Sequence, residues 1–142
     1  MKGKILVTVQ FTCLALMFIF TKWLEINWWT LGLLAFSGFL AMWAMVAMKP
    51  GNFNIVPYPV VKGVLVSHGP YRLIRHPMYT SIFIFAFALL AGQFDYIKLA
   101  ICLVLVTGLI IKMLFEESLL CKHYPGYKAY MLKTKRVIPF VW

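Results

Sequence analysis

Two clusters of polar residues interrupt an otherwise apolar chain, and both hold side chains able to do chemistry. The first, GPYRLIRHPMY at residues 69–79, contains Arg75, His76 and Tyr79. The second, KMLFEESLLCKHYPGYKAY at residues 112–130, contains Glu116 and Glu117, which are two of the 4 acidic residues in the chain. Cations beside paired carboxylates can bind a charged ligand, and a histidine can accept a proton. The two clusters are therefore the candidate functional residues.

Several common site motifs are missing from the sequence. No two glycines have G-x-G spacing, and there is no H-E-x-x-H, no cysteine–histidine cluster and no G-x-S-x-G. The sequence thus offers no dinucleotide fingerprint, phosphate-binding loop, zinc site or hydrolase elbow. Cys13 and Cys102 lie in apolar runs and no cysteines form a C-x-x-C pair, so we predict small core residues and no metal site.

Four apolar segments must position these clusters, at residues 5–24, 28–48, 79–92 and 96–115. The chain is 63% hydrophobic with a mean hydropathy of +0.85, against about 45–50% apolar residues in ordinary globular chains. A helix needs about 20 residues to cross a bilayer, and an isolated strand would leave its backbone unsatisfied there. We predict an all-α integral membrane bundle of about four transmembrane helices, with a cytoplasmic loop and a C-terminal amphipathic segment.

The charge distribution predicts the orientation of this bundle. The net charge is +10, and the two short connections hold only Lys22 and Lys98. The other basic residues lie mainly at the N-terminus, in the loop at residues 49–76 and in the C-terminal segment. By the positive-inside rule, both termini and the loop are cytoplasmic, and we expect a bacterial inner membrane. Because the basic residues are scattered between apolar runs, we expect membrane lipids as partners and no nucleic acid.

The short connections predict how the segments meet. Residues 25–27 join the first two segments, so residues 1–48 are expected to form a tight antiparallel N-terminal hairpin within a single domain, 1–142. Residues 92–95 join the last two segments. The start of the third segment and the end of the fourth are therefore expected to be neighbours in space, within the part of the chain at residues 49–142. The basic stretch at residues 124–142 is expected to rest on the membrane surface.

A purely structural interpretation is also open. Arg72, Arg75 and Lys112 would hold lipid phosphates, while Glu116 and Glu117 would pair with these cations at the polar end of a span. The predicted clustering favours function instead, because ionisable groups near membrane depth are functional candidates.

The two clusters also resemble a known family. GPYRLIRHPMY resembles the R-H-P-x-Y signature of the isoprenylcysteine carboxyl methyltransferase and phospholipid methyltransferase superfamily, and EESLLCKHYPGYKAYMLKTKRVIP resembles its C-terminal pattern. The resemblance covers about residues 50–140. It implies an integral membrane enzyme that binds S-adenosylmethionine at the cytoplasmic ends of its last spans, which makes residues 49–142 the cofactor-binding core.

The resemblance implies roles for individual residues. Glu116 would meet the ammonium of the cofactor, His76 and Arg75 would be catalytic, and Lys112 and Glu117 would contact the substrate. The residues implied to bind the cofactor are Gly63, Val64, Leu65, Val66, Tyr71, His76, Pro77, Met78, Tyr79 and Glu116. The sequence departs from the family at Lys112, where arginine is usual, and at Ser81, where glycine is common.

The predicted activity is methyl transfer from S-adenosylmethionine to a lipophilic or small membrane-partitioned acceptor, at a carboxylate, thiol or amine. Two other functions stay open at this point. One is an NADPH-dependent membrane reductase, since such reductases resemble this family at the C-terminal end. The other is a non-catalytic lipid-binding protein. The sequence does not identify the acceptor or the oligomeric state.

Overall fold

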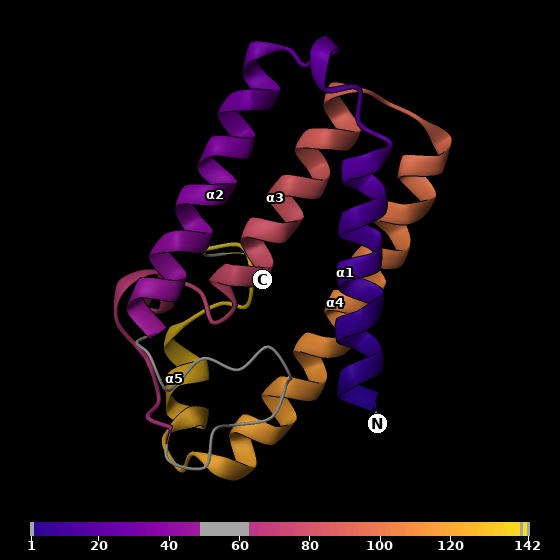
Figure 1. Ribbon diagram of the computed structural model, residues 1–142. Coiled ribbons are helices and arrows are strands. Elements are labelled where there is room, and N and C mark those ends of the chain that lie inside the picture. Colours follow the sequence, from indigo (N-terminus) through magenta and orange to yellow (C-terminus); the bar gives the residue numbers. More distant parts are fainter. Residues whose placement is uncertain (1, 49–62, 140, 142) are drawn as a thin grey trace.

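The computed structural model describes residues 2–48, 63–139 and 141, and this part of the chain is helical (Figure 1). Most of the predicted cytoplasmic loop, at residues 49–62, lies outside the described residues. The helices are α1 (Lys2–Ile19), α2 (Trp28–Met48), α3 (Pro77–Gly92), α4 (Tyr96–His123) and α5 (Tyr127–Lys133). Two 3-10 turns, η1 (Trp23–Glu25) and η2 (Gly69–Arg72), precede α2 and α3. The all-α prediction is confirmed for these residues.

The four long helices alternate in direction, but consecutive helices are not always packed together. The main packing pairs are α2 with α3 and α1 with α4, while α3 also contacts α4 and α1. Figure 1 shows α3 between α2 and α1. The prediction of a tight α1–α2 hairpin is therefore wrong in its packing. Small residues let α2 and α3 approach closely instead, and the Ser37 hydroxyl donates to the Ser81 carbonyl at 2.8 Å.

The bundle has a small core and an apolar exterior. Its core contains Cys13, Met17, Ala86, Leu89, Leu105 and Leu109. Large side chains such as Phe39, Met42 and Leu103 are exposed. Two helices, α2 and α4, are long and apolar enough to cross a membrane, while Gly3–Ile19 and α3 are shorter apolar helices. An apolar exterior of this kind suits a lipid environment.

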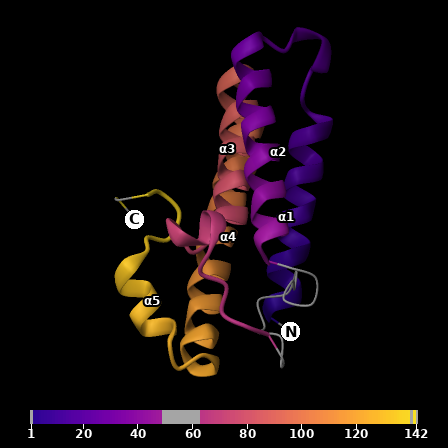
Figure 2. The same cartoon turned by 90° about the vertical axis from the view of Figure 1, so that its left-hand side faces the viewer.

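The C-terminal segment folds back onto the start of α3. After α5 the chain runs parallel to residues 73–76, with Ile74 and Lys135 forming an isolated bridge. The Arg75 amide donates to the Lys135 carbonyl at 2.8 Å, and the His76 amide donates to the Arg136 carbonyl at 3.0 Å. Figure 2 shows α5 and this returning segment on one side of the bundle. The segment therefore includes a helix of 7 residues and fixes the backbone of the first polar cluster.

Candidate active site

The local sequence explains why α3 starts where it does. Pro77 is the first residue of α3, where its missing N–H breaks no helical hydrogen bond, and His76 is the N-cap. Upstream, Gly69 has a φ of +59° and approaches α2 so closely that a Cβ there would lie 3.1 Å from Ala47 Cβ. Glycine is required at this turn, and the turn brings residues 71–76 to the end of the bundle.

Glu117 is the centre of a buried charged network. Its side chain is only 5% exposed, and its Oε1 lies 2.7 Å from Arg75 Nε. Its Oε2 lies 3.0 Å from Arg136 Nε, and His76 Nε2 is 3.3 Å from Oε1. The two arginines are the hydrogen-bonded cations that a buried carboxylate needs to stay charged. The pairing expected under the structural interpretation is thus found for Glu117 and Arg75.

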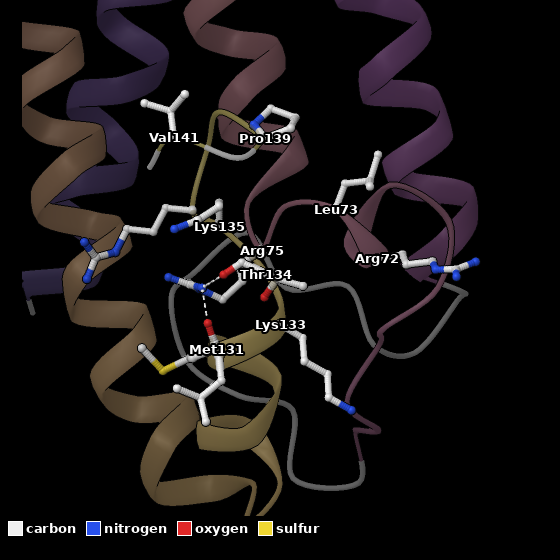
Figure 3. Close-up of a pocket in the computed structure, with 11 residues that line it drawn as sticks. Arg72, Leu73, Arg75, Met131, Lys133, Thr134, Lys135, Pro139 and Val141 are labelled. Carbon is white, nitrogen blue, oxygen red and sulfur yellow. Dashed lines mark hydrogen bonds between the residues drawn. The ribbon is translucent and has the colours of Figure 1, made fainter.

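Arg75 carries this network to the C-terminal segment. Its Nη1 donates to the Met131 carbonyl at 3.2 Å and also to the Thr134 carbonyl, as the dashed lines in Figure 3 show. The Arg75 side chain is 7% exposed. Arg75 therefore ties together the start of α3, the end of α4 and the chain around the end of α5.

Glu116 has different surroundings from Glu117. It is half-buried, and its Oε2 accepts a hydrogen bond of 2.6 Å from the Tyr79 hydroxyl. The Tyr79 ring stacks on the His76 ring, with centroids 5.3 Å apart and planes 11° apart. His76 consequently connects the two glutamates, through its Nε2 to Glu117 and through its ring face to the tyrosine bound to Glu116.

Lys112 lies about one turn before Glu116 on α4 and is buried. Its Nζ donates to Gln10 Oε1 at 2.8 Å and lies 5.2 Å from the centroid of the Tyr79 ring. The amide oxygen and the aromatic face both stabilise a buried cation. Gln10 was not among the predicted residues, because a single glutamine within an apolar run gives no local signal of its partner.

The other predicted residues form an adjoining group against α2. Val66 and Met78 pack on a small cluster of Ala44, Ala47 and Tyr71. Pro77 is buried, whereas Gly63 and Leu65 are half-buried and Val64 is exposed. The structure thus gathers His76, Tyr79, Lys112, Glu116 and Glu117 around the ends of α3 and α4. Val66, Tyr71 and Met78 instead pack together against α2.

A tyrosine hydrogen bond also joins α5 to the chain before α3. The Tyr130 hydroxyl donates to the Tyr71 carbonyl at 2.6 Å. Burial raises the pKa of Tyr130 to about 12, so this donor stays protonated at physiological pH.

Tyr127 and Arg136 are site residues that the sequence analysis did not identify. Tyr127 is 2% exposed, and in the described part of the chain its hydroxyl has no hydrogen-bond partner. Burial, followed by the negative charge of Glu117, raises the pKa of Tyr127, so it remains a donor. Its place in YPGYKAY, a stretch of the C-terminal family pattern, was the available signal. Arg136 lies in a basic run that gives no indication of a buried carboxylate partner.

Comparison with known families agrees with these motifs. A family model for phospholipid methyltransferases matches residues 26–126, which include α2, α3 and α4. The chain belongs to the phospholipid methyltransferase family, as the resemblance of the two clusters predicted. This membership indicates membrane methyltransferase activity. Neither the curated proteins nor the solved structures gave a match.

Proposed function

We propose that this protein transfers a methyl group from S-adenosylmethionine to a lipophilic or small membrane-partitioned acceptor. The observation that carries the proposal is the contrast between two adjacent carboxylates. Glu117 is already matched by Arg75, Arg136 and His76. Glu116 accepts a hydrogen bond from the neutral Tyr79 hydroxyl and is half-buried beside it. Glu116 is therefore the carboxylate suited to a cationic ligand.

The donors around Glu116 fit the polar groups of this cofactor. Its ammonium would pair with the Glu116 carboxylate, an interaction strengthened by charge. The buried hydroxyl of Tyr127, without a partner in the described part of the chain, offers a donor that a bound ligand would satisfy. The outer face of the His76 ring, opposite the face that stacks on Tyr79, would accommodate the adenine. Arg75 already binds Glu117 and two carbonyls, so we assign it to positioning His76.

When bound, S-adenosylmethionine would supply an electrophilic methyl group, which bonds to the acceptor as its bond to sulfur breaks and S-adenosylhomocysteine leaves. The protein contributes by holding the two reactants in line and by excluding water. An amine acceptor must lose a proton, and His76 is the base for this step. With a proton on Nε2 donated to Glu117, its Nδ1 is the nitrogen that accepts. Lys112 would contact the acceptor, held in place by Gln10.

The proposal includes a multi-pass topology in which α1 to α4 all cross the membrane. The end of the bundle that carries the two clusters is also rich in lysine and arginine, including Lys122, Lys128 and Lys133. The opposite end carries Lys22 and Lys98. The positive-inside rule then puts the clusters and both termini in the cytoplasm, where the cofactor is available.

Calorimetric titration tests the proposal. The protein in mild detergent is titrated with S-adenosylhomocysteine and, separately, with NADPH, and Glu116→Gln is compared with Glu25→Gln. Glu25 has the same chemistry but lies in η1 with its side chain 65% exposed. We expect binding of S-adenosylhomocysteine alone. A charged hydrogen bond contributes about 1.5–3 kcal/mol, so Glu116→Gln should weaken binding roughly 10-fold to 150-fold while Glu25→Gln leaves it unchanged.

Three outcomes would contradict the proposal. Binding of NADPH alone would indicate the reductase. Absence of binding by either ligand to folded protein would indicate a non-catalytic lipid-binding role. Equal affinities for Glu116→Gln and wild type would contradict the pairing of the cofactor with Glu116.

A further inference from the structure

A basic cavity lies outside the group of residues around Glu116. It has a volume of about 350 Å³ and lies between the chain before α3 and the returning C-terminal segment (Figure 3). Its basic lining residues are Arg72, Arg75, Lys133, Lys135 and Arg136, and no acidic residue of the described chain lines it. The sequence analysis did not predict it, since its two walls are about sixty residues apart.

The cavity is lined by more positive charges than the carboxylate of Glu117 can neutralise. Glu117 is shared between Arg75 and Arg136. The other three cations, Arg72, Lys133 and Lys135, have exposed side chains. Figure 3 shows these three spread around the cavity while Arg75 is held at its centre by carbonyls. Such an arrangement attracts an anion with several acceptor oxygens.

The cavity also has an apolar edge. Leu73, Leu132 and Val141 line it and are exposed, Leu132 at 90% and Val141 at 71%. In Figure 3, Pro139 and Val141 lie toward the body of the helices, whereas Lys133 lies at the opposite end. A soluble phosphate needs no apolar edge. A phospholipid presents a phosphate directly next to acyl chains, which fits a basic cavity that also has exposed apolar residues in its lining.

The walls of the cavity are fixed relative to one another. Backbone hydrogen bonds of 2.8 Å and 3.0 Å join Arg75 to Lys135 and His76 to Arg136. The Thr80 hydroxyl adds a bond of 2.9 Å to the Val137 carbonyl. The backbone that carries the basic side chains is therefore preformed, so binding requires little ordering of the main chain.

We propose that this cavity binds the headgroup phosphate of an anionic membrane phospholipid. The basic side chains that line the cavity attract the phosphate, and the apolar residues at its edge lie beside the start of the acyl chains. We assign this lipid a structural role. It fastens the C-terminal segment, and through Arg75 the Glu117 network, to the membrane surface. The inference rests on the proposed membrane placement but not on methyl transfer.

The test measures lipid affinity directly. Fluorescent phosphatidylglycerol and the matching phosphatidylcholine are titrated into the full chain in neutral detergent micelles. We expect tighter binding of phosphatidylglycerol. Since a basic residue near anionic lipid contributes about 1 kcal/mol, Arg72→Gln should weaken it roughly fivefold and Lys133→Gln with Lys135→Gln roughly 25-fold.

The control removes the same charge elsewhere. Lys122→Gln with Lys128→Gln changes two exposed lysines that do not line the cavity and should have little effect. Lys133→Arg with Lys135→Arg should retain binding. An equal loss of phosphatidylglycerol affinity in the control variant would show that binding depends on the overall surface charge and not on this cavity, and would overturn the proposal.

Two further outcomes would also overturn it. Displacement of the lipid by millimolar inorganic phosphate would indicate a soluble anion site. Loss of S-adenosylhomocysteine binding in the Lys133 and Lys135 variant would assign the cavity to the cofactor. Because both ligands are measured on the same samples, failure of lipid binding is separated from failure of the proposed activity.

Discussion

The two ends of the helical bundle hold their polar side chains by different means. At the end opposite the candidate site, the amide side chain of Gln93 is the centre of a group of hydrogen bonds. Its side chain accepts from the Lys22 amide at 3.0 Å and donates to the Lys22 carbonyl at 2.7 Å. Lys98 Nζ also donates to Gln93 Oε1 at 3.1 Å. This end joins the connections between the helices mainly through amides.

The site end depends on full charges from distant parts of the chain. Glu117 meets Arg75, 42 residues away, and Arg136, 19 residues away. A neutral bond can be lost for about 1 kcal/mol, whereas breaking a buried ion pair leaves an unmatched charge. Removing one partner at the site end should therefore lower the free energy of unfolding more than removing one partner at the opposite end. It also leaves Glu116 as the carboxylate with capacity for a ligand.

The largest effect is expected from Glu117→Ala. This change strands the buried Arg75 without its carboxylate, so the free energy of unfolding should fall by about 3–5 kcal/mol. Thermal and denaturant unfolding in detergent measure it. Glu25→Ala is the control, because its pair with Lys22 at 3.7 Å is largely exposed and should cost about 0–1 kcal/mol. Similar losses for the two variants would remove the distinction between the ends.

A smaller effect is expected from Gly92→Ala at the opposite end. The added Cβ would collide with Thr30 Oγ1 and lie 3.0 Å from Thr30 Cγ2. Overpacking of this kind costs about 1–3 kcal/mol, and Thr30→Ala in the same chain should recover part of it. Gly38→Ala, where nothing lies within 4 Å, is the matched control in unfolding experiments and should be neutral or stabilising. A harmless Gly92→Ala would mean that this end is loosely packed.

The smallest effect is expected from Asp95→Ala, which removes the cap of α4. The Asp95 carboxylate accepts from the Ile97 amide at 2.7 Å and from the Lys98 amide at 3.4 Å. Loss of such a cap lowers the free energy of unfolding by about 1 kcal/mol. Asp95→Asn should retain most of the stability, because asparagine also caps helices. Unfolding midpoints of the two variants give the difference. A cost as large as that of Glu117→Ala would show that this end also depends on charge.

Sequence patterns predicted the apolar helices well, because their composition is a local property. The expected segments at residues 28–48 and 96–115 correspond to α2 and α4, whereas the segment expected at residues 79–92 begins two residues earlier, at Pro77. The expected close packing of α1 against α2 was wrong, because a short connection fixes the direction of two helices but not their packing. Small residues on α2 and α3 decided that contact, with Ser37 bonded to the Ser81 carbonyl.

The sequence by itself determined the apolar helical segments and the family motifs. It also determined that the two polar clusters meet, because the short connection between α3 and α4 makes the start of α3 and the end of α4 neighbours. Only the tertiary structure decided which of the two glutamates is paired with arginines. Successive residues of an α-helix point about 100° apart, so Glu117 turns inward to Arg75 while Glu116 turns to Tyr79. Arg136 reaches Glu117 only because the C-terminal segment pairs with the start of α3, a contact that no local pattern encodes.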